Sequence, residues 1–269
     1  MENTSQTNRT IMAVLAVVIG VFMVAVAPFL IQVSIEKVLA ALIQISVEKP
    51  AYSSGIVIFA NLFPIYRGLI FIGGITLILI SGSIYKGKEW TFPVGLLASA
   101  FPSAGGMFMM MPYVSFIDGF PIPAGIAMVG LLFFWSFILL RNVDKWLIWG
   151  QFLVLTFSGM LTTHALITGT GNLRMLLTRP EKPLFDGLGT WILAWSAPIQ
   201  WICAILLFIA IFHIAARKYS GWWLALIAVT TLAAIDIPMQ IIRLTMTSST
   251  ALDYSYGLPM IIGLLFTLL

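Results

Sequence analysis

Long apolar runs, separated by short polar segments, dominate the sequence. A helix that crosses a bilayer needs about 17–25 mostly apolar residues. Seven runs meet this requirement, at Ile11–Gln32, Gly68–Tyr85, Phe92–Met111, Phe120–Leu140, Trp146–Ile167, Leu188–Ala215 and Trp222–Ile242. The pattern predicts an all-α, polytopic integral membrane protein with seven transmembrane helices, in which residues 1–269 form a single transmembrane domain.

A further apolar run, Leu258–Leu269, is shorter than the other seven. Twelve residues extend only about 18 Å as a helix, whereas the hydrocarbon core is about 30 Å thick. We therefore expect a partial or truncated eighth span. It is either a half-helix or the beginning of a span in a chain that continues past Leu269.

The segment between the first two spans has a different pattern. Within Val33–Val47, apolar residues recur at Val38, Leu42 and Ile45, which is the spacing of one helical face. This predicts an interfacial amphipathic helix after the first span, or an extension of that span as one long bent helix. The next stretch, Gly55–Tyr66, is apolar but is interrupted by an amide and a proline, which favours a re-entrant or interfacial segment.

Basic residues indicate the orientation. Three short connections, Lys86–Thr91, Arg141–Lys145 and Arg217–Gly221, are rich in Lys and Arg, and each contains or leads into a tryptophan. Short basic loops beside interfacial tryptophans are typical of the cytoplasmic side. Because these three loops share a side with the N-terminus, we expect a protein of the cell membrane or an inner membrane whose N-terminus is cytoplasmic.

Composition supports the membrane class and limits the partners. Hydrophobic residues make up 60% of the chain and charged residues 9%, with a mean hydropathy of +1.04. A globular domain has about 25% charged residues. The net charge of +4 comes from basic residues at helix ends, where they meet anionic head groups. Membrane lipids, and not nucleic acid, are therefore the expected partners.

Asp236 is the strongest candidate for a functional residue. It lies inside the seventh predicted span, where an acid costs about 2.5–3.5 kcal/mol on insertion scales. Pro238 releases a backbone carbonyl from its helical hydrogen bond. Gln240 and Arg243 follow close to the same helical face. We expect Asp236 in the outer third of the core, either as a binding residue or as an acid neutralised by Arg243.

Two further polar residues belong to the same half of the predicted bundle. His164 lies near the outer end of the fifth span, where it can meet Asp236. A Pro-x-Gln sequence that ends at Gln200 recurs at Gln240, and a proline with an amide is typical of interrupted helices that expose binding groups. The alternative is a kink with Gln200 bonded to a neighbouring helix. The predicted binding site comprises Asp236, Gln240, Arg243, His164 and Gln200.

No cofactor and no catalytic residues are expected. His164 and His213 belong to opposite leaflets in the predicted topology, and Cys203 is the single cysteine, which argues against haem and zinc. A run of methionines could supply thioethers for Cu(I). Near-consecutive positions point round a helix, however, which favours adaptable packing for Met107, Met109, Met110 and Met111.

Three functions follow from these observations. The leading hypothesis is the binding or translocation of a small molecule, ion or lipid through a polar site in the outer half of the bundle. The alternative is a non-catalytic accessory subunit of a larger complex, with other membrane subunits as partners. An intramembrane enzyme is third, because no catalytic motif stands out. No motif suggests a known family.

Overall fold

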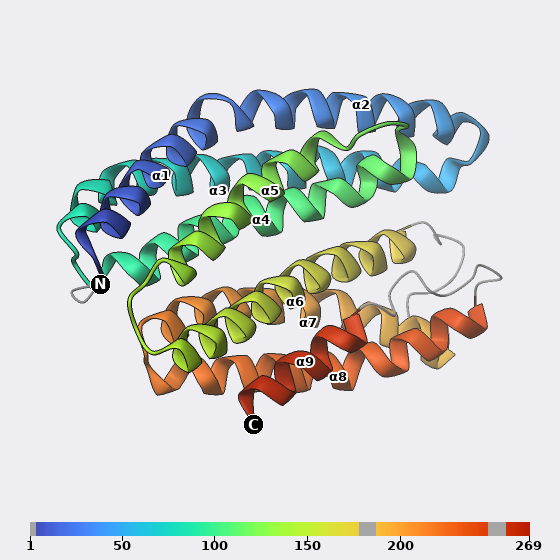
Figure 1. The fold of residues 1–269 in the computed structure, drawn as a ribbon. Helices are drawn as coiled ribbons and strands as arrows, with labels where there is room; N and C mark the ends of the chain where they lie inside the picture. Colours follow the sequence, from blue (N-terminus) through green and yellow to red (C-terminus); the bar gives the residue numbers. More distant parts are fainter. Residues whose placement is uncertain (1–3, 178–186, 247–256) are drawn as a thin grey trace.

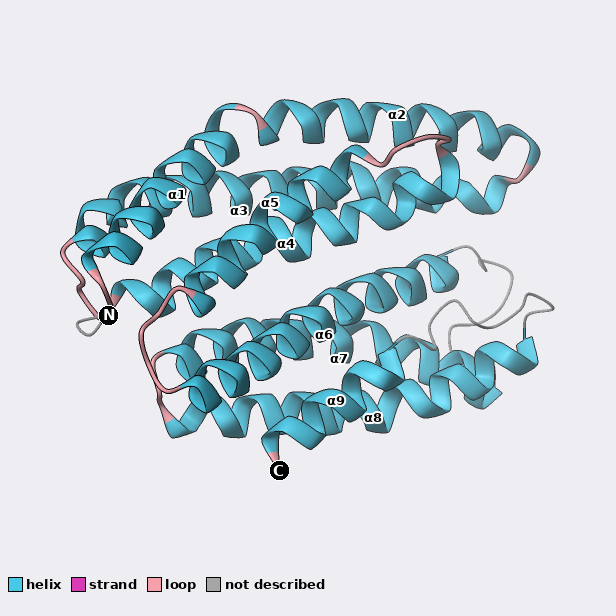
Figure 2. Ribbon diagram, in the orientation of Figure 1, coloured by secondary structure: helices cyan, strands magenta, loops and turns pink. Residues whose placement is uncertain are grey.

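The computed structural model describes residues 4–177, 187–246 and 257–269, and the regular elements in these ranges are all helices. They lie side by side in an elongated bundle (Figures 1 and 2). Eight helices are long and apolar enough to cross a membrane. This agrees with the predicted all-helical membrane class. In chain order the helices are α1 Gln6–Ala25, α2 Ala27–Glu48, a 3₁₀ turn Pro50–Tyr52, α3 Ser53–Tyr85, α4 Thr91–Phe116, α5 Ile122–Leu139, α6 Lys145–Leu177, α7 Gly187–Ala215, α8 Tyr219–Met246 and α9 Gly257–Leu268.

The N-terminal region differs most from the prediction. The expected span Ile11–Gln32 is divided at Val26, where α1 ends and α2 begins. Pro28 lies in the first turn of α2, and a proline there cannot donate the backbone bond that would continue α1. The two helices consequently run end to end along α3, with a bend between them (Figure 1).

The segment Val33–Val47 belongs to α2. Val38 and Leu42 are completely buried, whereas Val47 is 81% exposed. The helix α2 as a whole packs against α3, α4 and α5.

The prediction of a re-entrant segment at Gly55–Tyr66 was wrong. This stretch is the first part of α3, which continues through Pro64 to Tyr85. A proline inside a helix removes one hydrogen bond and usually bends the helix. Buried apolar side chains on both sides of it, at Phe63 and Tyr66, hold the helix in the bundle and compensate for that loss.

The helices form two layers, α1–α5 and α6–α9 (Figure 1). Close backbone approaches hold the first layer together. A Cβ atom on Gly74 would lie 2.8 Å from the carbonyl oxygen of Gly20, and one on Gly106 would lie 2.6 Å from the amide nitrogen of Ala127. Small residues at these contacts let α1 approach α3 and α4 approach α5, as in many membrane bundles.

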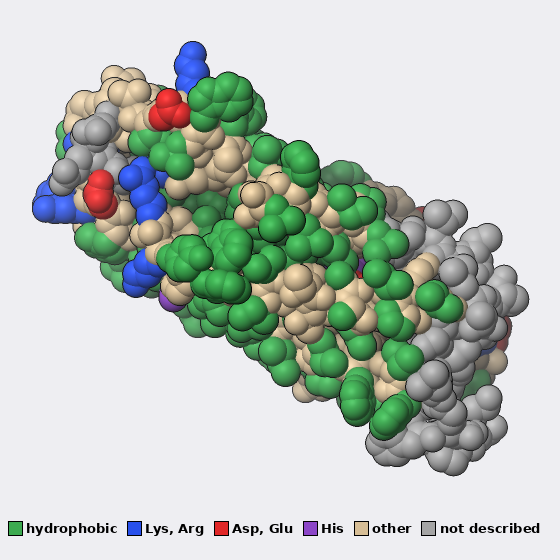
Figure 3. Space-filling model, turned by 90° about the horizontal axis from the view of Figure 1, so that it is seen from below, with side chains coloured by type: hydrophobic (Ala, Val, Ile, Leu, Met, Phe, Trp, Pro, Cys, Tyr) green, Lys and Arg blue, Asp and Glu red, His purple; other side chains and the backbone are tan. Residues whose placement is uncertain are grey.

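Lys and Arg side chains gather at one end of the molecule, and the long face over α8 and α9 is mostly hydrophobic (Figure 3). The loops α3–α4, α5–α6 and α7–α8 lie at the same end as the N-terminus (Figure 1). We call this the basic end. The grouping of the three basic loops agrees with the predicted pattern.

The last apolar run forms the short helix α9, which packs against α6 and α8. Its C-terminal carbonyls lack helical partners. Trp222 on α8 supplies one partner, because its indole N–H donates to the carbonyl oxygen of Leu268 at 2.7 Å. At its other end α9 begins at Gly257, directly against the ring of His164. The helix therefore extends from the level of His164 to the first turn of α8.

Candidate functional site

Asp236 lies in the interior of the bundle, with 5% of its surface exposed. One carboxylate oxygen, Oδ2, is 3.0 Å from Nε2 of His164 on α6. The other, Oδ1, accepts a hydrogen bond of 2.5 Å from the side-chain amide of Gln200 on α7. The carboxylate thus links three helices. Both of its oxygen atoms have partners from other helices.

Further buried polar side chains, from α6 and α7, connect to Asp236 through Gln200. The side-chain amide of Asn172 on α6 donates to the hydroxyl oxygen of Ser196 at 2.7 Å and lies 3.4 Å from Oε1 of Gln200. It also contacts the sulfur atom of Met239. Each polar member of this group is at least nine-tenths buried. We call His164, Asn172, Ser196, Gln200 and Asp236 the buried polar network.

Helical spacing places these residues on facing sides of their helices. His164 and Asn172 are eight residues apart on α6, and Ser196 and Gln200 are four apart on α7, so each pair shares a face. Asn172 and Ser196 were not among the predicted site residues. The apolar run used for prediction ended at Ile167, but α6 continues for another ten residues to Leu177, which keeps Asn172 inside the bundle. The eight-residue spacing from His164 was the signal that could have found it.

The other predicted residues lie nearby or elsewhere. Gln240 is one turn after Asp236 on α8 and is half-buried. The backbone of Arg243 belongs to α8, but its side chain lies outside the described residues. His213 is near the basic end of α7, where Nδ1 is 2.8 Å from the hydroxyl oxygen of Ser220. Among the residues that the structure describes, no three His, Cys, Asp or Glu side chains gather as a metal site requires.

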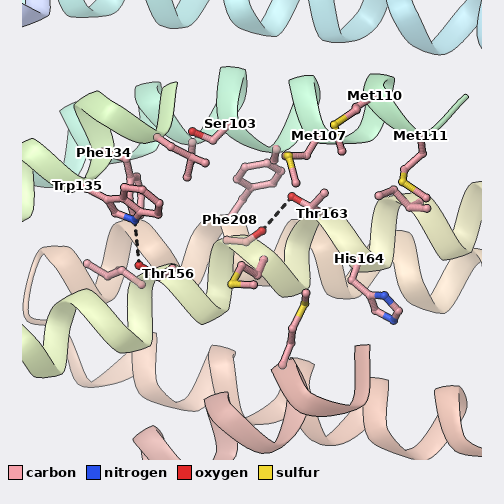
Figure 4. Close-up of a pocket in the computed structure, with 18 residues that line it drawn as sticks. Ser103, Met107, Met110, Met111, Phe134, Trp135, Thr156, Thr163, His164 and Phe208 are labelled. Atoms are coloured by element: carbon pink, nitrogen blue, oxygen red, sulfur yellow. Dashed lines mark hydrogen bonds between the residues drawn. The ribbon is translucent and has the colours of Figure 1, made fainter. Parts of the chain in front are cut away.

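A cavity of about 320 Å³ lies between the two layers and reaches His164. Met107, Met110 and Met111 extend into it from α4, opposite α6 (Figure 4). Three of the four methionines thus line one cavity, whereas Met109 is buried in the core, so the four do not converge on one point. Other lining side chains are mostly apolar and include Leu131, Phe134, Trp135, Leu155, Met160, Ile167, Phe208 and Met260.

The short helix α9 connects the cavity to the buried polar network. Gly257, its first residue, is against the ring of His164, and Met260, one turn later, lines the cavity. The N-terminus of a helix carries a partial positive charge. This end of α9 lies beside the ring of His164, which is hydrogen-bonded to Asp236.

Comparison of the chain with protein-family models, with curated proteins and with solved structures finds no significant match. The function is therefore inferred from the geometry of the site.

Proposed function

We propose that the chain binds a lipid-soluble small molecule in the cavity between the two layers, with a polar group of that molecule directed toward His164. The observation that carries this proposal is a cavity of about 320 Å³ that has a mostly apolar lining and reaches one member of the buried polar network. Binding sites for small molecules commonly combine apolar walls with a few convergent polar groups.

The volume of the cavity limits the size of the ligand. An apolar cavity of about 150 Å³ in another protein accommodates benzene. The present cavity is roughly twice that size, which suits two fused rings or a short acyl chain. Five methionines line it, and the flexible thioether side chain adapts to irregular shapes. We therefore expect tolerance toward related apolar ligands.

Access to the cavity is expected from the lipid and not from water. Met107 and Met160, which line it, are 37% and 41% exposed on the surface of the bundle. A lipid-soluble molecule dissolved in the bilayer could thus enter between α4 and α6. A helix that begins within a bundle, as α9 does, is a feature of many membrane binding sites and transporters. Translocation of the ligand remains part of the hypothesis.

Filling the cavity tests the proposal. A Cβ atom on Gly159 meets nothing within 4 Å, and this glycine lines the cavity, so Gly159→Leu should occupy the space without disturbing α6. Gly150→Leu on the same helix is the matched control, because it also meets nothing within 4 Å and does not line the cavity. Binding of 2-naphthol and of naphthalene to the purified full chain is measured by titration calorimetry.

We expect saturable binding of both probes to the unmodified chain and to Gly150→Leu, and a loss of affinity of at least about tenfold, or about 1.4 kcal/mol, in Gly159→Leu. Asp236→Asn should weaken 2-naphthol more than naphthalene, because only naphthol carries a polar group that senses the network. Equal binding by Gly159→Leu and Gly150→Leu would reject the cavity as the binding site.

The proposal includes a topology. We propose that α1 and α2 together make one bent crossing, because they pack end to end along the single helix α3. This gives seven crossings with α9 as a partial eighth, and the basic end is cytoplasmic. Single cysteines at Lys88 and Lys145 should react only from the cytoplasmic side, whereas one at Glu48 should react only from the opposite side. Labelling of all three from one side would contradict this arrangement.

An accessory subunit is the second candidate. Exposed apolar side chains are widespread on the first layer, including Val14, Val18, Phe29, Val57 and Leu79. Such a surface suits lipid as well as another subunit, so it favours neither candidate. Purification from the native membrane distinguishes them: a stoichiometric partner chain is expected only of a subunit. No observation favours the third candidate, an intramembrane enzyme.

A further inference from the structure

A second cavity, of about 180 Å³, lies at the basic end and is far more polar in its lining than the first. It is formed by the start of α4, by the connection between α5 and α6, and by the end of α7. We call it the arginine cleft, since Arg141 and Arg217 line it together with Glu89, Trp90 and Phe92. It is separate from the ligand cavity described above, and no residue lines both.

Arg141 is a buried cation in this cleft. Its side chain is 7% exposed, and its guanidinium lies 3.9 Å from the centre of the Phe92 ring. One guanidinium nitrogen, Nη1, donates to Gln151 Oε1 at 2.9 Å. The Nε atom has no hydrogen-bond partner among the described residues. A buried donor of this kind normally has an acceptor, because an unmade bond costs free energy.

Arg217 occupies an unusual backbone position. Its φ angle is +56°, in the left-handed region, where it closes the end of α7. The amide nitrogen of Lys218 bonds to the carbonyl oxygen of His213, which is the usual geometry for a helix that ends in a glycine. A residue with a side chain costs free energy in this conformation. Glycine would remove that cost, so we expect the arginine side chain to have a function at this position.

The charges around the cleft favour an anion. Burial, and then the neighbouring charge of Arg217, lower the pKa of Arg141 to about 10, while Glu89 acts in the opposite direction. Arg141 therefore stays protonated at neutral pH. Two arginine cations face a cavity that contains one carboxylate, and α4 begins beside it with the positive end of its helix dipole.

We propose that the arginine cleft binds a phosphate group, carried by an anionic phospholipid or free in solution. Guanidinium groups bind phosphate oxygens through strong charge-assisted hydrogen bonds. The neighbouring Trp90 is 52% exposed at the same end, as expected of a side chain at the membrane interface, where lipid phosphates are found. A phosphate in the cleft would accept a bond from the buried Arg141 and reduce the repulsion between the two arginines.

The test uses the purified full chain in nanodiscs of phosphatidylcholine, with or without phosphatidylglycerol, and a third arm in which inorganic phosphate is added to phosphatidylcholine nanodiscs. Thermal unfolding is measured for the unmodified chain, Arg217→Gln, Arg217→Gly and Arg141→Gln. Lys218→Gln is the matched control, because it removes the same charge from the adjacent residue, which does not line the cleft. Affinity for phosphatidylglycerol is measured in parallel by native mass spectrometry.

We expect phosphatidylglycerol to raise the melting temperature of the unmodified chain and of Lys218→Gln. Both Arg217 variants should lose this increase, with a fall in lipid affinity of about fivefold per arginine. Arg217→Gly should nevertheless be the more stable chain in phosphatidylcholine alone, because it relieves the backbone cost. Arg141→Gln, if it folds, should lose the same increase in melting temperature. The two Arg217 variants test the proposal without it.

The arms distinguish the source of the phosphate. Stabilisation by phosphatidylglycerol alone indicates a lipid headgroup, and stabilisation by inorganic phosphate indicates a soluble ligand. Equal loss in Lys218→Gln and Arg217→Gln would show that only surface charge matters and would overturn the proposal. An absence of any response to both phosphate sources in the unmodified chain would also overturn it.

Discussion

Buried polar groups are satisfied in different ways in the two layers. In the first layer, the hydroxyl groups of Ser34, Ser99 and Ser103 donate to carbonyl oxygens of their own helices. In the second layer, Asp236 and Asn172 are bonded to side chains from other helices. A hydrogen bond within one helix forms regardless of where that helix packs. A hydrogen bond between two helices, by contrast, fixes the depth and rotation of each helix relative to the other. The first layer is therefore held mainly by shape, and the second by shape and polar recognition.

The largest effect is expected from removing the centre of the second layer's network. Asp236→Ala leaves the bonding groups of His164 and Gln200 in an apolar interior, and should lower the free energy of unfolding by about 2–3 kcal/mol. Asp236→Asn keeps the shape and should cost less. Unfolding by sodium dodecyl sulfate in mixed micelles gives both values. A cost for Asp236→Ala as small as that of Ile235→Val would break the comparison.

In the first layer, a comparable loss of stability should result from disturbing close helix packing, with no polar group removed. Gly74→Ala puts a methyl group 2.8 Å from the Gly20 carbonyl oxygen, so α1 and α3 must separate, at a cost of about 2 kcal/mol. At Gly68 on the same helix, the added methyl meets nothing within 4 Å. Gly68→Ala should stabilise the chain by about 0.5–1 kcal/mol through helix propensity. The same unfolding measurement applies, and a loss in both variants would argue against close packing as the cause.

Removal of the hydrogen bond that anchors the end of α9 should have a smaller effect on the free energy of unfolding. Trp222→Phe removes the indole bond to the Leu268 carbonyl and should cost about 1 kcal/mol. Hydrogen exchange at the C-terminal end of α9 should become faster, while exchange in α3 should be unchanged. Trp223→Phe is the control, because that ring is 47% exposed. Unchanged exchange in α9 after Trp222→Phe would show that packing alone holds this helix.

The smallest effect on the free energy of unfolding is expected from two matched serines, one in each layer. Ser196 and Ser99 are both fully buried serines. Ser196→Ala removes an acceptor for Asn172 on another helix and should cost about 0.6 kcal/mol, an average value for such bonds in membranes. Ser99→Ala removes only a bond within its own helix and should be nearly neutral, because alanine is the better helix former. Equal costs would mean that the two layers do not differ as described.

Local pattern indicated Asp236, His164 and Gln200, which the structure brings together in the buried polar network. Asp236 stood out because an acid among apolar residues is costly in any membrane helix. The depth of His164 could be estimated from the helical rise, and the structure places it 3.0 Å from Asp236. Asn172 was missed because apolar windows end where polar residues begin, although the helix itself continues. The cavity could not be predicted, since its walls come from five helices far apart in the sequence.

The sequence by itself determined the all-helical class, the presence of several helices long and apolar enough to cross a membrane, and the grouping of basic loops, because hydropathy and helix length are local properties of the chain. The tertiary structure decided the bend at Val26, the continuity of α3 through Pro64, the bonding partners of Asp236 and the pairing of Arg141 with Arg217 around one cleft. These features depend on how each helix is rotated and how closely it approaches its neighbours. Rotation and approach are set by packing between distant segments, which no local window of sequence contains.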